Sequence, residues 1–174
     1  MLAALRFIGL LNAAIWLGSL VFFTACVGPS FFSEEMLRIL GKPHAGAAAQ
    51  VVLGRYFELQ FWCAGIAVVH LVSEWLYTGR PVHRSILIVL GTVIFLEVAG
   101  GYFLQPRLKD LHYAMYHPRS TVPQREAARK SFGMLHGVAQ TMNLLVLGGV
   151  LFYLWHTAQW TGNTRFLSAS KFRG

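Results

Sequence analysis

Four apolar stretches, each long enough to cross a lipid bilayer, occupy most of this 174-residue chain. The hydrocarbon core of a bilayer is about 30 Å thick and requires roughly 20 apolar residues in a helix. Within that core every backbone polar group must be satisfied inside the segment, so helices are the default structure. The sequence therefore predicts an all-α, polytopic membrane protein built as an antiparallel bundle of four transmembrane helices.

The limits of the spans follow from where charged residues stop. The third span carries a single acid, Glu97, and no Asp, Glu, Lys or Arg occurs from Ser131 to Thr164. These spans form one transmembrane domain over residues 1–160, followed by a basic tail over 161–174. The expected spans are about 3–27, 56–78, 85–105 and 131–157.

The segment 31–40, which follows the first span, reads as a short amphipathic helix. Such a helix can lie in the plane of the membrane interface with its apolar side buried. Gly41-Lys42-Pro43 should end it, because glycine and proline both interrupt helices. We expect interfacial docking by its apolar residues, which are Phe31, Phe32, Met36, Ile39 and Leu40.

The charge pattern fits a membrane surface better than nucleic acid. The net charge is +8, but the Lys and Arg residues flank the spans, where they meet anionic lipid headgroups. No basic stripe is interleaved with stacking aromatic residues, as single-strand binders require. We expect membrane lipids as partners, some of them bound, and no nucleic acid.

Orientation is predicted from the loops. We call the side of the N-terminus side A and the opposite side B. The side-B loops, 28–55 and 106–130, hold nine Lys and Arg residues against six on side A. Because cytoplasmic loops are enriched in Lys and Arg, this favours a cytoplasmic side B in a multi-pass protein of the bacterial inner membrane.

Polar side chains at membrane depth are costly, which makes them functional candidates. Asn12, Glu97 and Asn143 each lie near the middle of a span by sequence, and His136, Gln140 and Asn143 share one helix face at i, i+4 and i+7. We expect these five residues to form a buried polar cluster. Such a cluster either joins helices by hydrogen bonds or binds a proton or another ligand.

Histidines suggest a second kind of site, because helical bundles hold haem and metals with side chains from facing helices. His112, His117 and His136 all belong to side B and could converge on one metal, whereas His70 lies nearer side A. Their spacing is nonspecific. Haem or a metal is therefore an alternative to histidines that are simply hydrogen-bonded or interfacial.

Small residues four positions apart let neighbouring helices approach closely. Gly9 and Ala13 have this spacing in the first span, where Gly18 pairs with Ala14 in the same way, and Gly133 and Gly137 have it in the fourth. We expect helix packing at these positions.

Three functions stay open on the sequence alone. No nucleophile elbow, P-loop or dinucleotide fingerprint occurs, so we do not expect an enzyme. The leading hypothesis is an accessory or structural subunit of a larger membrane complex, docked to other membrane-protein subunits through the 31–40 segment and the small-residue faces. The alternatives are a haem- or metal-binding electron-transfer subunit, and a small transporter or permeability factor that uses Asn12, Glu97 and Asn143.

Short motifs along nearly the whole chain resemble a known family. They are Trp16-x-Gly18, Phe22-Phe23, Pro29-x-Phe31-Phe32, Gln105-Pro106-Arg107 and Phe132-Gly133-x-Leu135-His136-Gly137. This pattern resembles the bacterial and eukaryotic domain of unknown function grouped with transmembrane protein 205. The resemblance implies a four-helix integral membrane protein and supplies no catalytic residues. The positions it highlights are Trp16, Pro29, Pro106, His136 and Asn143.

Overall fold

The computed structural model describes residues 2–79 and 81–169, and over these residues it is helical without strands. Four of its helical segments are long and apolar enough to cross a membrane. They are Ala3–Phe31, Glu34–Thr78, Arg84–Tyr116 and Val122–Gln159. The predicted all-α fold with four transmembrane helices is confirmed, and the protein is a multi-pass membrane protein.

The first segment continues further than the sequence suggested. α1 (Leu2–Phe22) runs into a π-helical turn, η1 (Phe23–Val27), and then into α2 (Gly28–Phe31). Pro29 does not stop the helix, because it lies in the first turn of α2, where its missing N–H is not needed.

α3 (Glu34–Thr78) begins at a capped end and contains the predicted break. The hydroxyl of Ser33 accepts a hydrogen bond from the Met36 N–H at 3.3 Å, which satisfies one free donor of the first turn. Gly41 has φ 69° and ψ 158°, a conformation that favours glycine, so the chain kinks there. The piece before the kink holds only part of the helix predicted over 31–40, because Phe31 ends α2 and Phe32 lies between the two helices. Ile39 of this piece is 71% exposed.

α4 (Arg84–Val98), the π-helical turn η2 (Ala99–Leu104) and α5 (Gln105–Tyr116) form one continuous helical rod. The predicted end at Gln105-Pro106 is wrong, because Pro106 again occupies a first helical turn. The rod ends before His117-Pro118, where the residue preceding proline leaves the α region.

α6 (Val122–Ala169) is one long helix that includes the predicted fourth span. The predicted basic tail is part of this helix up to Ala169, and residues 170–174 of that tail lie outside the described residues. The side chains from Trp160 onward are also outside the description.

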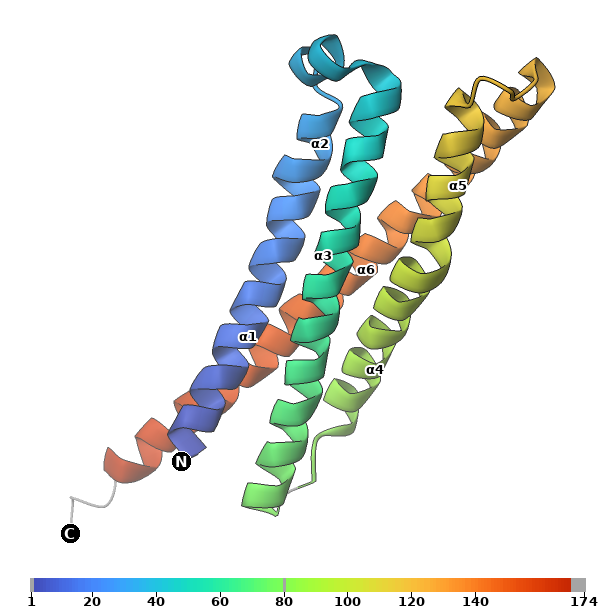
Figure 1. The fold of residues 1–174 in the computed structure, drawn as a ribbon. Helices are drawn as coiled ribbons and strands as arrows, with labels where there is room; N and C mark the ends of the chain where they lie inside the picture. The colour runs from blue at the N-terminus through green and yellow to red at the C-terminus, as the bar shows by residue number, and fades with distance from the viewer. Residues whose placement is uncertain (1, 80, 170–174) are drawn as a thin grey trace.

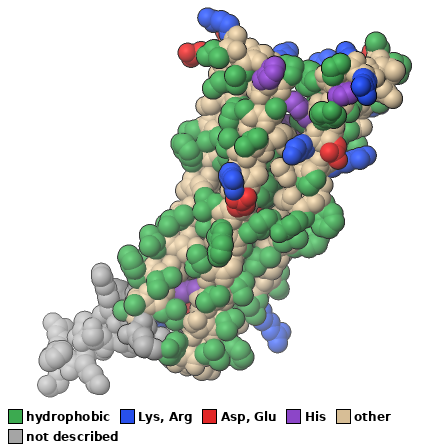
Figure 2. All heavy atoms as spheres, viewed as in Figure 1, with side chains coloured by type: hydrophobic (Ala, Val, Ile, Leu, Met, Phe, Trp, Pro, Cys, Tyr) green, Lys and Arg blue, Asp and Glu red, His purple; other side chains and the backbone are tan. Residues whose placement is uncertain are grey.

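α1, α3 and the α4–α5 rod lie side by side, and α6 crosses behind them at an angle (Figure 1). α6 packs against α1, α4 and α5, and α1 packs against α3. In the face shown in Figure 2, most charged side chains gather at the side-B end, and hydrophobic side chains cover much of the rest. This distribution suits a body surrounded by lipid.

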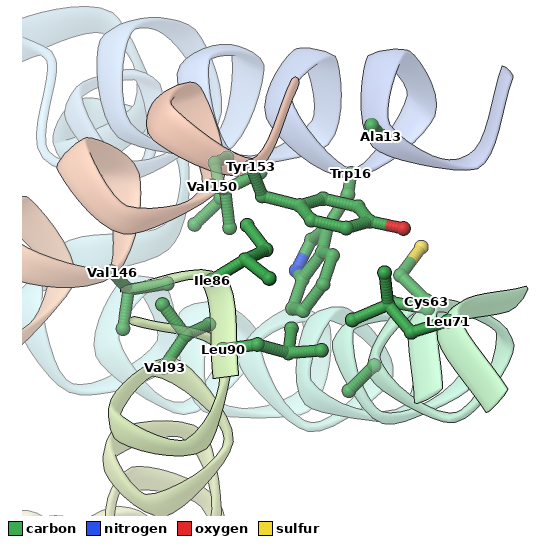
Figure 3. Close-up of a cluster of buried hydrophobic side chains, with 13 residues drawn as sticks. Ala13, Trp16, Cys63, Leu71, Ile86, Leu90, Val93, Val146, Val150 and Tyr153 are labelled. Atoms are coloured by element: carbon green, nitrogen blue, oxygen red, sulfur yellow. The ribbon is translucent and has the colours of Figure 1, made fainter. Parts of the chain in front are cut away.

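The core lies where α6 crosses the other helices. Trp16 is fully buried there, with its ring centroid 6.3 Å from that of Tyr153 in an edge-to-face arrangement. Figure 3 shows the Trp16 indole pointing into a cluster of apolar side chains. The buried cluster consists of Ala13, Trp16, Leu20, Cys63, Ala64, Ala67, Leu71, Ile86, Leu90, Val93, Val146, Val150 and Tyr153.

Candidate functional site

Polar contacts join the facing sides of α1 and α3 at two levels. The Asn12 amide nitrogen donates to the backbone carbonyl of Cys63 at 3.0 Å. Two turns further toward side B, the Gln60 amide nitrogen donates to the Ser19 hydroxyl at 3.1 Å. These contacts place polar groups inside a bundle whose outer surface is apolar.

Glu97 of α4 enters this polar layer at the level of Trp16. Its side chain is only 3% exposed, and the indole of Trp16 lies beside the carboxyl group. Cys63 and Tyr56 of α3 lie close enough to interact with the carboxylate electrostatically. Trp16 is near the centre of the apolar helical segment Ala3–Phe31, so Glu97 lies near the middle of the span.

Three buried polar atoms in this layer have no hydrogen-bond partner among the described residues. They are Oε2 of Glu97, Nε1 of Trp16 and Oε1 of Gln60. Buried polar groups in proteins are paired in the large majority of cases, and each unpaired group requires an explanation. We call Trp16, Gln60 and Glu97 together the Glu97 site.

A second polar contact closes the side-B end of this interior. The Tyr56 hydroxyl donates to the Asn143 side-chain oxygen at 3.2 Å, and the Asn143 amide donates to the Thr24 hydroxyl at 2.8 Å. Thr24 lies in the side-B half of the apolar helical segment Ala3–Phe31, so Asn143 lies in the side-B half of the bundle.

The predicted cluster of five polar residues is therefore divided. Asn12 and Glu97 are buried, whereas Gln140 and His136 are exposed on the outside of α6. Asn143 is half-buried and bonds to Tyr56 and Thr24. His136, Gln140 and Asn143 share one face of α6, as their spacing predicts. Of these three described residues, only Asn143 is half-buried against other helices, and the other two are exposed.

His70 is separated from the other histidines. It is buried between α1, α3 and α6, with its ring against Gly9 and its Nδ1 3.4 Å from the Tyr153 hydroxyl. Its Nε2 has no hydrogen-bond partner among the described residues. This position suits a packed core histidine.

The side-B histidines do not converge. The ring of Phe132 stacks on His136 at 5.8 Å and lies 6.3 Å from His112, so it separates the two. His117 instead packs against Tyr113 at 4.8 Å. No three His, Cys, Asp or Glu side chains gather anywhere in the described part of the chain, so the predicted metal or haem ligands form no common site there.

The small residues also differ in their surroundings. Gly9 and Ala13 face the bundle interior, as expected for packing residues. By contrast, a Cβ atom at Gly18, Gly133 or Gly137 would meet nothing within 4 Å, so these three glycines do not support a neighbouring helix of the described chain.

The sequence analysis missed Gln60 and Tyr56. Both could have been found, because Tyr56, Gln60, Cys63 and His70 are spaced i, i+4, i+7 and i+14 and therefore share one face of α3. All of them now lie on the side of α3 that faces the interior, where Gln60, Cys63 and His70 are buried. A search limited to the middle of each span excluded them.

The fold and this site define a four-helix membrane protein with a buried carboxyl group in a polar interior. Residues 11–117 match the family described as Domain of unknown function (DUF4149), and the chain belongs to that family. The matched range contains all three residues of the Glu97 site and ends before α6. No curated protein and no solved structure matches the chain.

Proposed function

We propose that this protein is a small transporter or permeability factor in which Glu97 binds and releases the transported ion. The observation that carries the proposal is the burial of Glu97 near the middle of its span, with one carboxyl oxygen that has no hydrogen-bond partner in the described part of the chain. An ionisable side chain at this depth is expensive and marks ion pathways and proton relays in membrane proteins.

The surroundings of Glu97 support this proposal over a purely structural role. A carboxyl group that only joined helices would be expected to have both oxygens satisfied by its neighbours. Here the Trp16 indole is the donor that lies beside the carboxyl group, and Oε1 of Gln60 in the same layer has no hydrogen-bond partner among the described residues. The resemblance to the transmembrane protein 205 group and a place in the bacterial inner membrane are compatible with this role and add no chemistry to it.

Flux measurements on the purified protein in liposomes test the proposal. We would trap a pH-sensitive dye, or dyes for sodium and potassium, and impose a gradient of each ion in turn. Wild type should show flux of at least one ion above empty liposomes, and Glu97→Gln should reduce that flux at least tenfold.

The matched control is Glu58→Gln, which removes an exposed carboxylate paired with Arg55 at 2.8 Å. This variant should keep the wild-type flux. Absence of any flux in wild type, or equal flux in wild type and Glu97→Gln, would refute the proposal.

We also propose, as a second candidate, the accessory subunit of a membrane complex. It is favoured by the outer face of α6, where Gly133 and Gly137 have open space and Gln140 is exposed. Small residues with a polar neighbour are typical of membrane helix–helix interfaces. Affinity purification from native membranes in mild detergent should recover stoichiometric membrane partners, and Gly137→Phe should release them. Recovery of this chain without partners would exclude the candidate.

A further inference from the structure

α5 and the start of α6 enclose an open groove at the side-B end of the bundle. The two helices pack against each other and are joined by the short connection 117–121 (Figure 1). The groove between them has a volume of about 520 Å³. Its walls combine apolar and hydrogen-bonding side chains, among them Leu111, Ala114, His117, Gln124, Ala127 and Ser131.

The groove lies at the height of the lipid headgroups along α6. Ser131 at its inner end is the first residue of the stretch without Asp, Glu, Lys or Arg. Gln124 at its outer end comes seven residues earlier, which is about 10 Å along the helix. The headgroup layer is roughly 5–8 Å thick on each side of a bilayer. A lipid beside α6 therefore has its headgroup level with the groove and its acyl chains level with the apolar part of the helix.

The outer end of the groove presents hydrogen-bond donors. The Arg119 N–H donates to Nδ1 of His117 at 3.2 Å, so the proton of the neutral His117 ring lies on Nε2. The Thr121 N–H donates to Oε1 of Gln124 at 2.9 Å, which leaves the amide N–H groups of Gln124 as donors. No Asp or Glu lines the groove in the described part of the chain. These groups suit a ligand that accepts hydrogen bonds, such as a phosphate group.

A positive charge is held at the same end of the groove. Nη2 of Arg125 donates to the backbone carbonyls of His117 at 3.3 Å and of Pro118 at 3.5 Å. These two bonds keep the guanidinium group beside a residue that lines the groove. The surrounding segment 105–131 is basic as well, with six Lys and Arg residues and two acids. Basic clusters at a membrane surface attract anionic lipids.

We propose that this groove binds the headgroup of an anionic phospholipid. The phosphate oxygens accept hydrogen bonds from His117 Nε2 and from the Gln124 amide, and Arg125 balances their charge. The apolar wall, which includes Leu111 and Ala127, contacts the glycerol and the first acyl carbons. Phosphatidylcholine has no net charge and gains less from Arg125. This lipid site is separate from the Glu97 site, and its test measures lipid binding instead of ion flux.

Native mass spectrometry of the purified protein in detergent measures lipid binding directly. The probes are phosphatidylglycerol and phosphatidylcholine with identical acyl chains, each titrated against delipidated protein. Wild type should bind one phosphatidylglycerol at least tenfold more tightly than phosphatidylcholine. A hundredfold excess of glycerophosphoglycerol, the same headgroup without acyl chains, should not displace it. Equal affinity for the two lipids would overturn the inference, and so would displacement by glycerophosphoglycerol, which would mark a site for soluble phosphate compounds.

Two variants locate the bound lipid in the groove. Arg125→Gln keeps a hydrogen-bonding side chain but removes the charge, and Ala127→Phe fills the groove at an exposed position without changing the charge. Each should weaken phosphatidylglycerol binding at least fivefold. The matched controls are Arg129→Gln and Val122→Phe, which change exposed residues of α6 that do not line the groove.

Both control variants should bind phosphatidylglycerol within twofold of wild type. Equal weakening by Arg125→Gln and Arg129→Gln would show a diffuse attraction to the basic surface and would overturn the assigned site. Unchanged binding in Ala127→Phe would overturn it too, because the groove would then be filled without loss of the lipid.

Discussion

Gly9 of α1 lies directly against the imidazole ring of His70 of α3, and a Cβ atom at Gly9 would overlap that ring. The contact brings the two helices together one turn from Asn12, whose amide bonds to the Cys63 carbonyl. Since Tyr153 of α6 contacts the same histidine, three helices meet at this point. The spacing of α1 and α3, and with it the polar interior, depends on the absence of a side chain at Gly9.

Substitution Gly9→Ala should destabilise the protein by about 1–3 kcal/mol, the usual range for overpacking a filled core. The free energy of unfolding in mixed detergent micelles, from denaturant titration, measures this. Gly18→Ala is the matched control on the same helix, because nothing lies within 4 Å of its added methyl group. That control should stay within about 0.5 kcal/mol of wild type. Equal losses in both variants would contradict the packing assigned to Gly9.

Adjacent glycines of α6 offer a sharper comparison. A Cβ atom at Gly149 would overlap a Cγ of Val93, a β-branched side chain with little rotamer freedom, whereas at Gly148 it would meet nothing within 4 Å. We expect Gly149→Ala to lower the thermal unfolding midpoint and Gly148→Ala to leave it unchanged or raise it, since alanine favours helix. The opposite order would mean that α6 is rotated from the orientation described here.

The sequence predicted the fold well because apolar length and charge placement decide which segments cross a bilayer. The kink at Gly41 and the helix end at His117-Pro118 can also be predicted from the sequence, since each depends on the local backbone chemistry of glycine or proline. The expected ends of the first and third spans, at about 27 and 105, fall just before Pro29 and Pro106 and were wrong for one reason. Proline is tolerated in the first turn of a helix, and sequence alone does not show that a π-helical turn precedes each one.

The site was predicted less completely. Asn12 and Glu97 were identified because they are isolated polar residues in apolar spans, and both are buried. The bonds of Asn143 to Tyr56 and Thr24 were not predicted, since they depend on the crossing angle of α6, which only tertiary packing sets. The grouping of Glu97 with Trp16 and Gln60 likewise depends on how α1, α3 and α4 are rotated against each other.

Replacing Glu97 by glutamine should change the free energy of unfolding by less than about 1 kcal/mol, because the amide has nearly the same shape and no buried charge. Glu97→Ala, which removes most of the buried side chain, should cost about 2 kcal/mol or more. Both values come from the same denaturant titration. A large loss in Glu97→Gln would show that the carboxyl group itself holds the helices together, and a structural role would then replace the proposed one.

Asn143 and Gln140 lie on the same helix, three residues apart, but only Asn143 bonds to other helices, through Tyr56 and Thr24. Interhelical hydrogen bonds in membranes are worth about 0.6 kcal/mol on average, so Asn143→Leu should cost about 1 kcal/mol. Gln140→Leu should be neutral or stabilising, since its amide is exposed on the outer face of α6. The decisive measurement is a double-mutant cycle with Tyr56→Phe. A coupling energy between Asn143→Leu and Tyr56→Phe of about 0.6 kcal/mol, absent for Gln140→Leu, would establish that the bond closing the side-B end exists in the membrane. Additive effects would show that the ring of Tyr56 is held by its stack on Phe23 alone.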